Sequence, residues 1–179
     1  LAKGNLKISN LDGKIIKTEL ELLKRFGAKI KSHKEKIFIK GPEKIRPIKN
    51  IKTKEYPGIA TDLQSQIMVL MCKANGKGSI TENIFENRFM HVAELRRLGA
   101  KIDVENNKAY IYGNTKFIGA ELMSSDLRAS VSLVLAAMVS KGKSIINRIY
   151  HLDRGYENIE HKLKKIGVKI KRLKQWANT

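Results

Sequence analysis

Residues 125–157 read SDLRASVSLVLAAMVSKGKSIINRIYHLDRGYE, and this stretch decides the fold. Ser125 and Asp126 indicate the start of a helix, with a hydroxyl at the N-cap and an acid in the first turn. Residues 131–139 are apolar on nearly every side, so we expect this helix to be buried. Residues 144–150 are rich in isoleucine and are expected to form the strand that follows.

The same stretch carries a polar group at each end. Asp126 and Arg128 lie in the first turn of the expected helix, and Arg154 and Gly155 lie beyond the expected strand. Charges at the edge of a core need partners or a ligand. Two guanidinium groups, a helix N-terminus and a glycine are the parts of an oxyanion or phosphate pocket. The sequence therefore predicts an anion site here.

A helix that ends at a glycine and passes into a strand occurs three times along the chain. The three segments are LLKRFGAKI at 22–30, ELRRLGAKI at 94–102 and KLKKIGVKI at 162–170. Each is interpreted as an amphipathic helix with a glycine C-cap, at Gly27, Gly99 and Gly167, followed by an alternating strand. A polar turn interrupts the first two strands, at 28–39 and 100–112, so we expect hairpins there.

The buried helix is repeated as well. TDLQS at 61–65 aligns with SDLRA at 125–129, and each motif opens a mostly apolar helix, over 63–74 and 127–139. A Gly-Lys turn and a strand with Ser-Ile follow in both cases. The predicted unit is therefore α-β-α-β-β, with buried helices and outer sheets in an α/β fold. We expect one domain that holds a partial first repeat at 1–55, a second repeat at 56–119 and a third at 120–179.

Composition limits the class of protein. The chain has 179 residues and a formal net charge of +19, which invites a nucleic-acid interpretation. The basic residues are mostly dispersed singly and are not interleaved with aromatics, as a stacking platform requires. A solvated lysine-rich surface is therefore favoured, and a basic nucleic-acid-binding module is kept as an alternative. A basic pocket for a phosphorylated small molecule accounts for the charge equally well.

Other features argue against a membrane, a disulfide or a metal. The sequence has no run of about 18 apolar residues, so we expect no membrane-spanning helix. The single cysteine, Cys72, lies in an apolar stretch and is predicted to be a small buried side chain in a reducing, cytoplasmic compartment. The four histidines are scattered, and we expect no metal site. Leu1 in place of an initiator Met suggests a fragment or a processed chain.

Five motifs together resemble the C-terminal half of the UDP-N-acetylglucosamine 1-carboxyvinyltransferase family, also called UDP-N-acetylglucosamine enolpyruvyl transferases. The motifs are YPG at 56–58, TDLQ at 61–64, FENRFMH at 85–91, DLRAS at 126–130 and DRGYE at 153–157. They occur in the family's order and cover essentially the whole chain. The resemblance implies the inside-out α/β barrel of enolpyruvyl transferases, with two domains of three repeats each.

The resemblance also implies a reaction and roles for particular residues. The family transfers the enolpyruvyl group of phosphoenolpyruvate to the 3′-hydroxyl of UDP-N-acetylglucosamine and releases phosphate, which is the first committed step of peptidoglycan and cell-wall synthesis. Asp62 matches the aspartate placed at that hydroxyl, and Arg128 and Arg154 match arginines that hold the phosphoenolpyruvate anion. Ile84 matches a position whose backbone contacts the sugar nucleotide. Taken alone, Asp62 would be interpreted as a helix-capping acid, and either arginine equally well as a structural ion pair.

Glu86, Arg88 and Asp126 are expected near the site, either as framework ion pairs or as direct contacts. No cofactor is implied. One departure is Ala60, which stands where the family usually has proline before Thr-Asp. The family's Lys-Asn pair and its loop cysteine belong to an N-terminal domain that this sequence does not contain, so that domain is an expected partner and we expect the chain alone to be inactive. A 5-enolpyruvylshikimate-3-phosphate synthase is the alternative within the fold, although FENRFMH favours the sugar-nucleotide branch.

Overall fold

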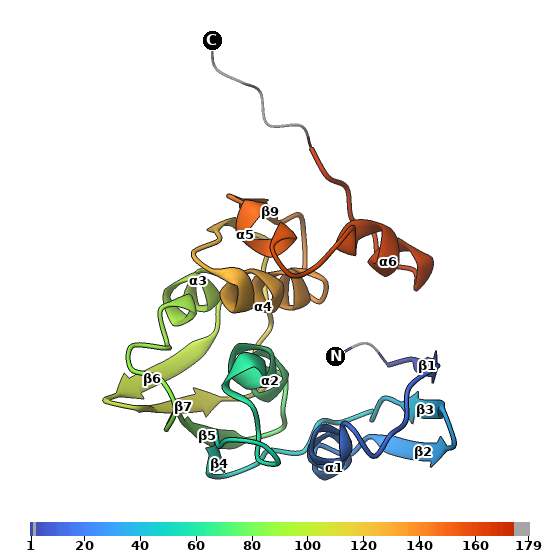
Figure 1. Ribbon diagram of the computed structural model, residues 1–179. Helices are drawn as coiled ribbons and strands as arrows, with labels where there is room; N and C mark the ends of the chain where they lie inside the picture. Colours follow the sequence, from blue (N-terminus) through green and yellow to red (C-terminus); the bar gives the residue numbers. More distant parts are fainter. Residues whose placement is uncertain (2, 174–179) are drawn as a thin grey trace.

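The computed structural model describes residue 1 and residues 3–173 (Figure 1). The N-terminal part is a small antiparallel sheet with one helix. In chain order it contains β1 (Asn5–Ser9), α1 (Lys17–Arg25), β2 (Lys29–His33) and β3 (Lys36–Lys40). The strand order is β1-β3-β2, and β2 pairs with β3 from Lys29↔Lys40 onward. The hairpin predicted over 28–39 is therefore confirmed.

The middle part has the order α-β-α-β-β that the repeat predicted. It contains β4 (Ile51–Lys52), η1 (Thr61–Leu63), α2 (Gln64–Cys72), β5 (Lys77–Thr81), α3 (His91–Arg97), β6 (Lys101–Glu105) and β7 (Lys108–Tyr112). The four-stranded sheet has the order β4-β5-β7-β6, with β4 and β5 parallel and the other pairs antiparallel. The predicted hairpin over 100–112 is thus confirmed as β6 and β7.

The C-terminal part begins with a parallel pair of strands that a helix connects. It contains β8 (Glu121–Met123), α4 (Leu127–Ala137), β9 (Ile145–Asn147), α5 (Tyr150–Asp153) and α6 (Ile159–Lys165). β8 and β9 pair from Glu121↔Ile145 to Met123↔Asn147. The crossover from β8 to β9 runs through α4, as a parallel pair requires.

The two apolar helices occupy the centre of the molecule. In Figure 1, α2 lies over the four-stranded sheet, α4 lies over α2, and α5 lies over α4. Met68, Cys72 and Leu133, from these helices, are fully buried in one continuous core. Both helices were expected to be buried because their sequences leave no wide polar face. Their packing against each other brings their N-termini to one side of the fold.

The glycine caps follow the predicted pattern. Gly27, Gly99 and Gly167 end α1, α3 and α6 with φ of 104°, 96° and 92°. Side chains with a Cβ rarely adopt this left-handed conformation, so glycine is the natural residue after each helix. These three positions fix where the repeated helices stop.

Three local predictions were wrong. Asp126 rather than Ser125 is the N-cap of α4, because its carboxylate accepts from two N–H groups of the first turn. The expected strand over 144–150 stops at Asn147, since Arg148 adopts φ of 57° and α5 starts at Tyr150. Residues 168–173 form no strand: among the described residues no neighbouring strand pairs with them. An extended segment without a neighbouring strand has no inter-strand hydrogen bonds to stabilise it as a strand.

Cys72 is a buried thiol, as predicted. It is fully buried in α2, and burial raises the pKa of its thiol to about 12. Because only the thiolate reacts, we expect labelling by a disulfide reagent at pH 8 to be roughly 10³-fold slower in the folded chain than in urea. The measurement is the rate of thionitrobenzoate release with and without denaturant. Complete labelling of the folded chain within minutes would contradict this placement.

None of the helices in the described part of the chain combines the length and the apolar character that crossing a bilayer needs. In the same residues, no group of three or more His, Cys, Asp or Glu side chains is arranged to hold a metal ion.

Candidate functional site

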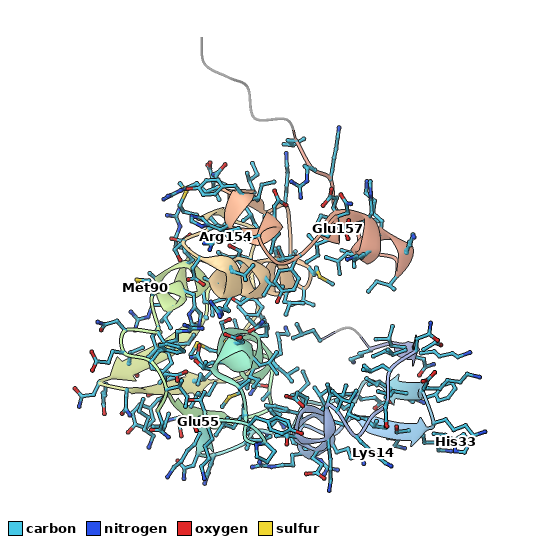
Figure 2. The ribbon with its side chains drawn as sticks, in the orientation of Figure 1. Lys14, His33, Glu55, Met90, Arg154 and Glu157 are labelled. Carbon is cyan, nitrogen blue, oxygen red and sulfur yellow. The ribbon has the colours of Figure 1, made fainter. Side chains whose placement is uncertain are left out.

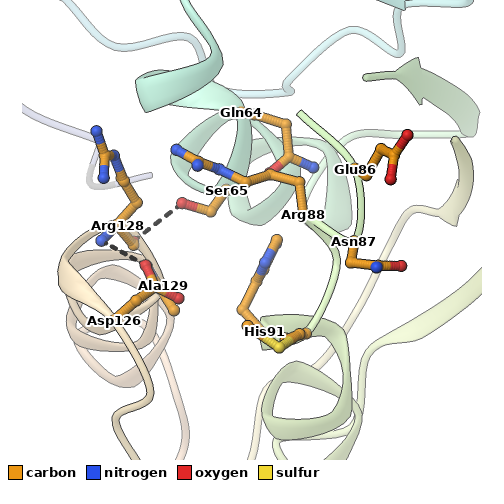
Figure 3. Close-up of a pocket in the computed structure, with 10 residues that line it drawn as sticks. Gln64, Ser65, Glu86, Asn87, Arg88, His91, Asp126, Arg128 and Ala129 are labelled. Carbon is orange, nitrogen blue, oxygen red and sulfur yellow. Dashed lines mark hydrogen bonds between the residues drawn. The ribbon is translucent and has the colours of Figure 1, made fainter. Parts of the chain in front are cut away.

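The site lies where the N-termini of α2 and α4 meet (Figure 3). The Ser65 hydroxyl, in the first turn of α2, donates to the carbonyl oxygen of Arg128 at 3.0 Å. Asp126 caps α4, and its Oδ1 accepts from the N–H groups of Arg128 at 2.9 Å and Ala129 at 3.0 Å. The hydrogen bond from Ser65 thus ties the first turns of the two helices together, although they belong to motifs far apart in the sequence.

The two helices start differently. α4 begins directly at its Asp126 cap, whereas α2 is preceded by the 3₁₀ turn η1, and neither Ala60 before η1 nor Leu63 before α2 provides a side-chain cap. Asp62 lies inside η1 and so does not cap its helix as Asp126 does. Its carboxylate is free to point out toward other groups.

Asp62 is at the centre of a charge cluster with two arginines. Its Oδ1 accepts from Arg128 Nε at 2.6 Å and from Arg88 Nη2 at 3.3 Å. This carboxylate raises the pKa of the Arg128 guanidinium above its ordinary value, partly opposed by burial. The Asp62 side chain is 58% exposed, so the pairs contribute little stability, of order 0–1 kcal/mol each. The cluster therefore holds a carboxylate and two cations together in contact with solvent.

A pocket of about 200 Å³ lies beside this cluster. Its lining residues are Gln64, Ser65, Glu86, Asn87, Arg88, Met90, His91, Asp126, Arg128 and Ala129. Gln64 and His91 are almost fully buried, and the Nε2 atom of each has no hydrogen-bond partner in the described part of the protein. In Figure 3 the His91 ring and the Arg88 side chain both reach into the space below Gln64. The pocket thus combines the guanidinium groups of Arg88 and Arg128 and two carboxylates with the buried, neutral side chains of Gln64 and His91.

His91 is neutral at pH 7. Burial lowers the pKa of its imidazole to about 4, and the nearby Arg88 charge acts in the same direction. Asp126 and the backbone of Arg88 oppose the effect but are weaker than burial. The floor of the pocket therefore offers an uncharged imidazole, and the positive charge of the site comes from its arginines.

The structure brings together most of the residues that the sequence singled out. Asp62, Arg128 and Arg88 form the cluster, while Glu86 and Asp126 line the pocket. Arg88 was expected near the site either as an ion pair or as a direct contact, and it forms an ion pair with Asp62 at 3.3 Å.

Arg154 lies apart from the pocket lining. It is exposed at the C-cap of α5, and within the described residues its side chain makes no hydrogen bond or ion pair (Figure 2). The next residue, Gly155, packs on Leu127: a Cβ there would lie 3.0 Å from the leucine methyl groups. This close approach places the segment that carries Arg154 against the start of α4, at Leu127.

Ile84 also lies outside the pocket lining. Its N–H donates to Glu82 Oε1 at 2.9 Å, so this half of its peptide group is already engaged. Its side chain is partly exposed. A ligand that contacts the Ile84 backbone would therefore use the carbonyl oxygen.

Sequence reasoning missed several residues of the site. They are Gln64, Ser65, Asn87, Met90, His91 and Ala129 in the pocket lining, and Glu82 beneath the loop at 83–85. The first six fall inside or beside the quoted motifs, so their position at the helix starts was a usable signal. Glu82 follows a strand with no motif of its own, and nothing in the pattern pointed to it.

The chain matches known proteins over nearly its whole length. The family model for EPSP synthase (3-phosphoshikimate 1-carboxyvinyltransferase) matches residues 1–163. The chain is 64% identical over 97% of its length to a UDP-N-acetylglucosamine 1-carboxyvinyltransferase from Pelagibacter ubique, and spans 41% of that relative. It is 47% identical over 97% of its length to the protein of the same name from Desulfosudis oleivorans, again spanning 41% of it.

Solved structures show the same fold. The enolpyruvyl transferase NikO from Streptomyces tendae matches 96% of this chain with 40% of its own, at a TM-score of 0.86 and 28% identity. An EPSP synthase from Acinetobacter baumannii matches 97% of this chain with 40% of its own, at 0.71 and 14% identity, which supports the fold alone. The predicted α/β class is thus confirmed as the mixed α/β fold of enolpyruvyl transferases.

The chain spans about two-fifths of the length of the curated relatives it matches. Its resemblance to the UDP-N-acetylglucosamine 1-carboxyvinyltransferases, which the five motifs had indicated, is confirmed over nearly the whole chain. Because the family model matches residues 1–163 of 179, the chain belongs to the EPSP synthase (3-phosphoshikimate 1-carboxyvinyltransferase) family.

Proposed function

We propose that this chain forms one wall of the active site of a UDP-N-acetylglucosamine 1-carboxyvinyltransferase. The enzyme transfers the enolpyruvyl group of phosphoenolpyruvate to the 3′-hydroxyl of UDP-N-acetylglucosamine, in the cytoplasm, at the start of peptidoglycan synthesis. Relatives of that name support the assignment. The observation that carries it is the contact of Asp62 Oδ1 with Arg128 Nε at 2.6 Å, which joins a proton acceptor to an anion-binding group.

Asp62 is suited to accept the proton of the sugar hydroxyl. Its carboxylate is largely exposed and is not committed to capping a helix. In the addition step the hydroxyl oxygen bonds to C2 of phosphoenolpyruvate, Asp62 accepts the hydroxyl proton, and C3 gains a proton. In the elimination step C3 loses a proton, the bond from C2 to the phosphate oxygen breaks, and phosphate leaves.

The arginines are suited to hold the phosphoenolpyruvate anion. Arg128 uses only Nε on Asp62, and within the described residues its two Nη atoms make no hydrogen bond to protein. Arg154 is exposed on the segment packed against the start of α4. A planar guanidinium binds carboxylate and phosphate through two parallel hydrogen bonds, and its charge stabilises the oxyanions of the addition intermediate. Ile84 contributes its backbone to the sugar nucleotide, and Glu86, Arg88 and Asp126 support these groups.

The remaining length of the relatives supplies the second wall. We infer that the chain is a single domain of the inside-out barrel, with a partial first repeat at 1–55, a second at 56–119 and a third at 120–179. The order of elements from α2 to β7 and the central position of α2 and α4 support this division. "Complete enzyme" below means the protein in which this chain is joined to the portion that its relatives have in addition.

The test is Arg128→Lys in the complete enzyme. Lysine keeps the charge but loses the planar fork, so anion binding should weaken by about 1.5–3 kcal/mol, or roughly 10- to 150-fold. The loss should appear as a higher KM for phosphoenolpyruvate, with the KM for UDP-N-acetylglucosamine nearly unchanged, in steady-state phosphate release. Arg97→Lys, on the exposed side of α3, is the matched control. If both changes raised the KM for phosphoenolpyruvate equally, Arg128 would not be a residue that binds this anion.

The acceptor is the second point to test, because the matching family model is named for EPSP synthase. The complete enzyme should release phosphate from phosphoenolpyruvate with UDP-N-acetylglucosamine as acceptor. Activity with shikimate 3-phosphate instead would replace the proposed function by the alternative.

A further inference from the structure

Glu82 is a buried carboxylate at the end of β5. It is 2% exposed, and among the described residues no lysine or arginine pairs with it. A buried carboxylate is costly unless its lone pairs are satisfied. Its environment therefore has to supply hydrogen-bond donors instead of a cation.

Four donors surround this carboxylate. Oε1 accepts from the Thr53 hydroxyl at 2.7 Å and from the backbone N–H groups of Ile84 at 2.9 Å and Phe85 at 3.3 Å. Oε2 accepts from the Thr61 hydroxyl at 2.9 Å. A carboxylate is the side chain that offers acceptors on both of its ends, whereas an amide would direct an NH₂ group at some of these donors.

The two oxygens hold two different parts of the site. Oε2 holds Thr61, the first residue of η1 and the direct neighbour of Asp62. Oε1 holds the loop at 83–85, which contains Ile84. Thr53 adds to this hold, because its hydroxyl also accepts from the N–H of Asn83 at 2.9 Å. We call the contacts of Oε2 with Thr61 the Thr61 arm, and the contacts of Oε1 with Thr53 and this loop the Thr53 arm. One rigid side chain thus connects the segment that carries the proton acceptor with the loop assigned to the sugar nucleotide.

We propose that Glu82 is a positioning residue that fixes the distance between Asp62 and the sugar-nucleotide loop, without touching the substrate. This inference rests on the proposed function, which assigns Asp62 and Ile84 their roles. Its consequence is that the two arms control different kinetic constants. The Thr61 arm governs the alignment of Asp62 and hence kcat, and the Thr53 arm governs the loop and hence the KM for UDP-N-acetylglucosamine.

Valine replacements of the two threonines test each arm in the complete enzyme, because valine keeps the shape and removes the hydroxyl. Thr61→Val should lower kcat roughly 10- to 100-fold, since small misplacements of a reacting group are costly. Thr53→Val should raise the KM for UDP-N-acetylglucosamine roughly 10-fold, with a much smaller change in kcat. Thr115→Val is the matched control: Thr115 is buried, and its hydroxyl donates to the carbonyl of Tyr112 away from the site.

A double variant shows whether Thr61 acts through Asp62. Adding Thr61→Val to Asp62→Asn should lower kcat by less than about 2-fold, because coupled residues are not additive. If the two changes multiply instead, or if all three valine variants lower kcat alike, Glu82 only stabilises the fold and the inference is overturned.

Amide hydrogen exchange gives a readout that does not depend on activity. Thr61→Val should speed exchange around η1, and Thr53→Val should speed it at 83–85, each by roughly 10-fold or more. Unchanged exchange in both segments would overturn the inference even if the enzyme proved inactive. Conversely, a silent Asp62→Asn together with the expected exchange pattern would contradict the proposed function and leave the two arms of Glu82 intact.

Discussion

Asp62→Asn in the complete enzyme should lower turnover by about 10²–10⁴-fold. Asparagine preserves the shape of the side chain and one acceptor oxygen, but it cannot take the proton of the sugar hydroxyl. The hydrogen bonds from Arg128 Nε and Arg88 Nη2 go to the same Oδ1 atom, so the amide oxygen can keep both. Sugar-nucleotide affinity should therefore change much less than kcat. The measurement is steady-state phosphate release with each substrate varied in turn.

Asp103→Asn is the matched control for this experiment. Asp103 is exposed on β6, at the outer edge of the four-stranded sheet, and the same chemical change there should leave kcat within a few-fold of the parent. If Asp62→Asn behaved like this control, Asp62 would be a structural acid at a helix start, and the proposed mechanism would lose its proton acceptor.

Acidification should destabilise the fold by roughly 3 kcal/mol through His91 alone. Its folded pKa is about 4, below the ordinary value of 6.5, because burial disfavours the charged ring. The unfolded chain therefore binds the proton more tightly, and stability that is complete above pH 6.5 is lost as the pH falls toward 4. At pH 5 about 2 kcal/mol of this loss should already be present. The charged groups near the ring do not reverse this shift: Arg88 lowers the pKa of His91 further, and Asp126 raises it by less than burial lowers it.

The measurement is urea unfolding of the parent and of His91→Gln between pH 4 and pH 8. The variant should be less stable at neutral pH, because glutamine fits the site less well, yet its stability should fall less steeply between pH 6.5 and pH 4.5. The difference in slope isolates His91 from carboxylates that titrate in both proteins. His33→Gln, on exposed β2, should keep the parental slope. Identical slopes for parent and His91→Gln would show that the ring is not buried as described.

Much of the architecture could be predicted because its signals are local. A glycine with positive φ ends each repeated helix, and alternating residues around a polar turn are typical of a hairpin. The alignment of TDLQS with SDLRA also predicted two equivalent buried helices, and equivalent helices of a repeat are expected to start on the same side of the core. In the structure the two helix starts do lie together, with Arg128 Nε donating to Asp62 Oδ1.

The rest of the site depends on contacts between distant residues. Glu82 meets donors from Thr53 and Thr61, which are 29 and 21 residues away, and no periodicity encodes such a meeting. The strand predicted over 144–150 was wrong because Arg148 adopts a left-handed conformation that its residue type does not announce. The N-cap of α4 was assigned to Ser125 instead of Asp126 for a simpler reason. Serine and aspartate are both favourable N-cap residues, so the sequence does not show which of two neighbours takes this position.

Asp62 and Asp126 occupy the same position in two aligned motifs of this chain, yet their carboxylates make different contacts. The extra 3₁₀ turn before α2 is what separates them. If α2 began without the 3₁₀ turn, as α4 does, Asp62 would be its N-cap, and its carboxylate would accept from backbone N–H groups. Winding one turn more tightly instead leaves that helix without a side-chain cap and releases its carboxylate toward Arg128. Two segments with the same aligned aspartate can thus differ through their backbone alone: in one the carboxylate caps a helix, and in the other it faces solvent and two arginines.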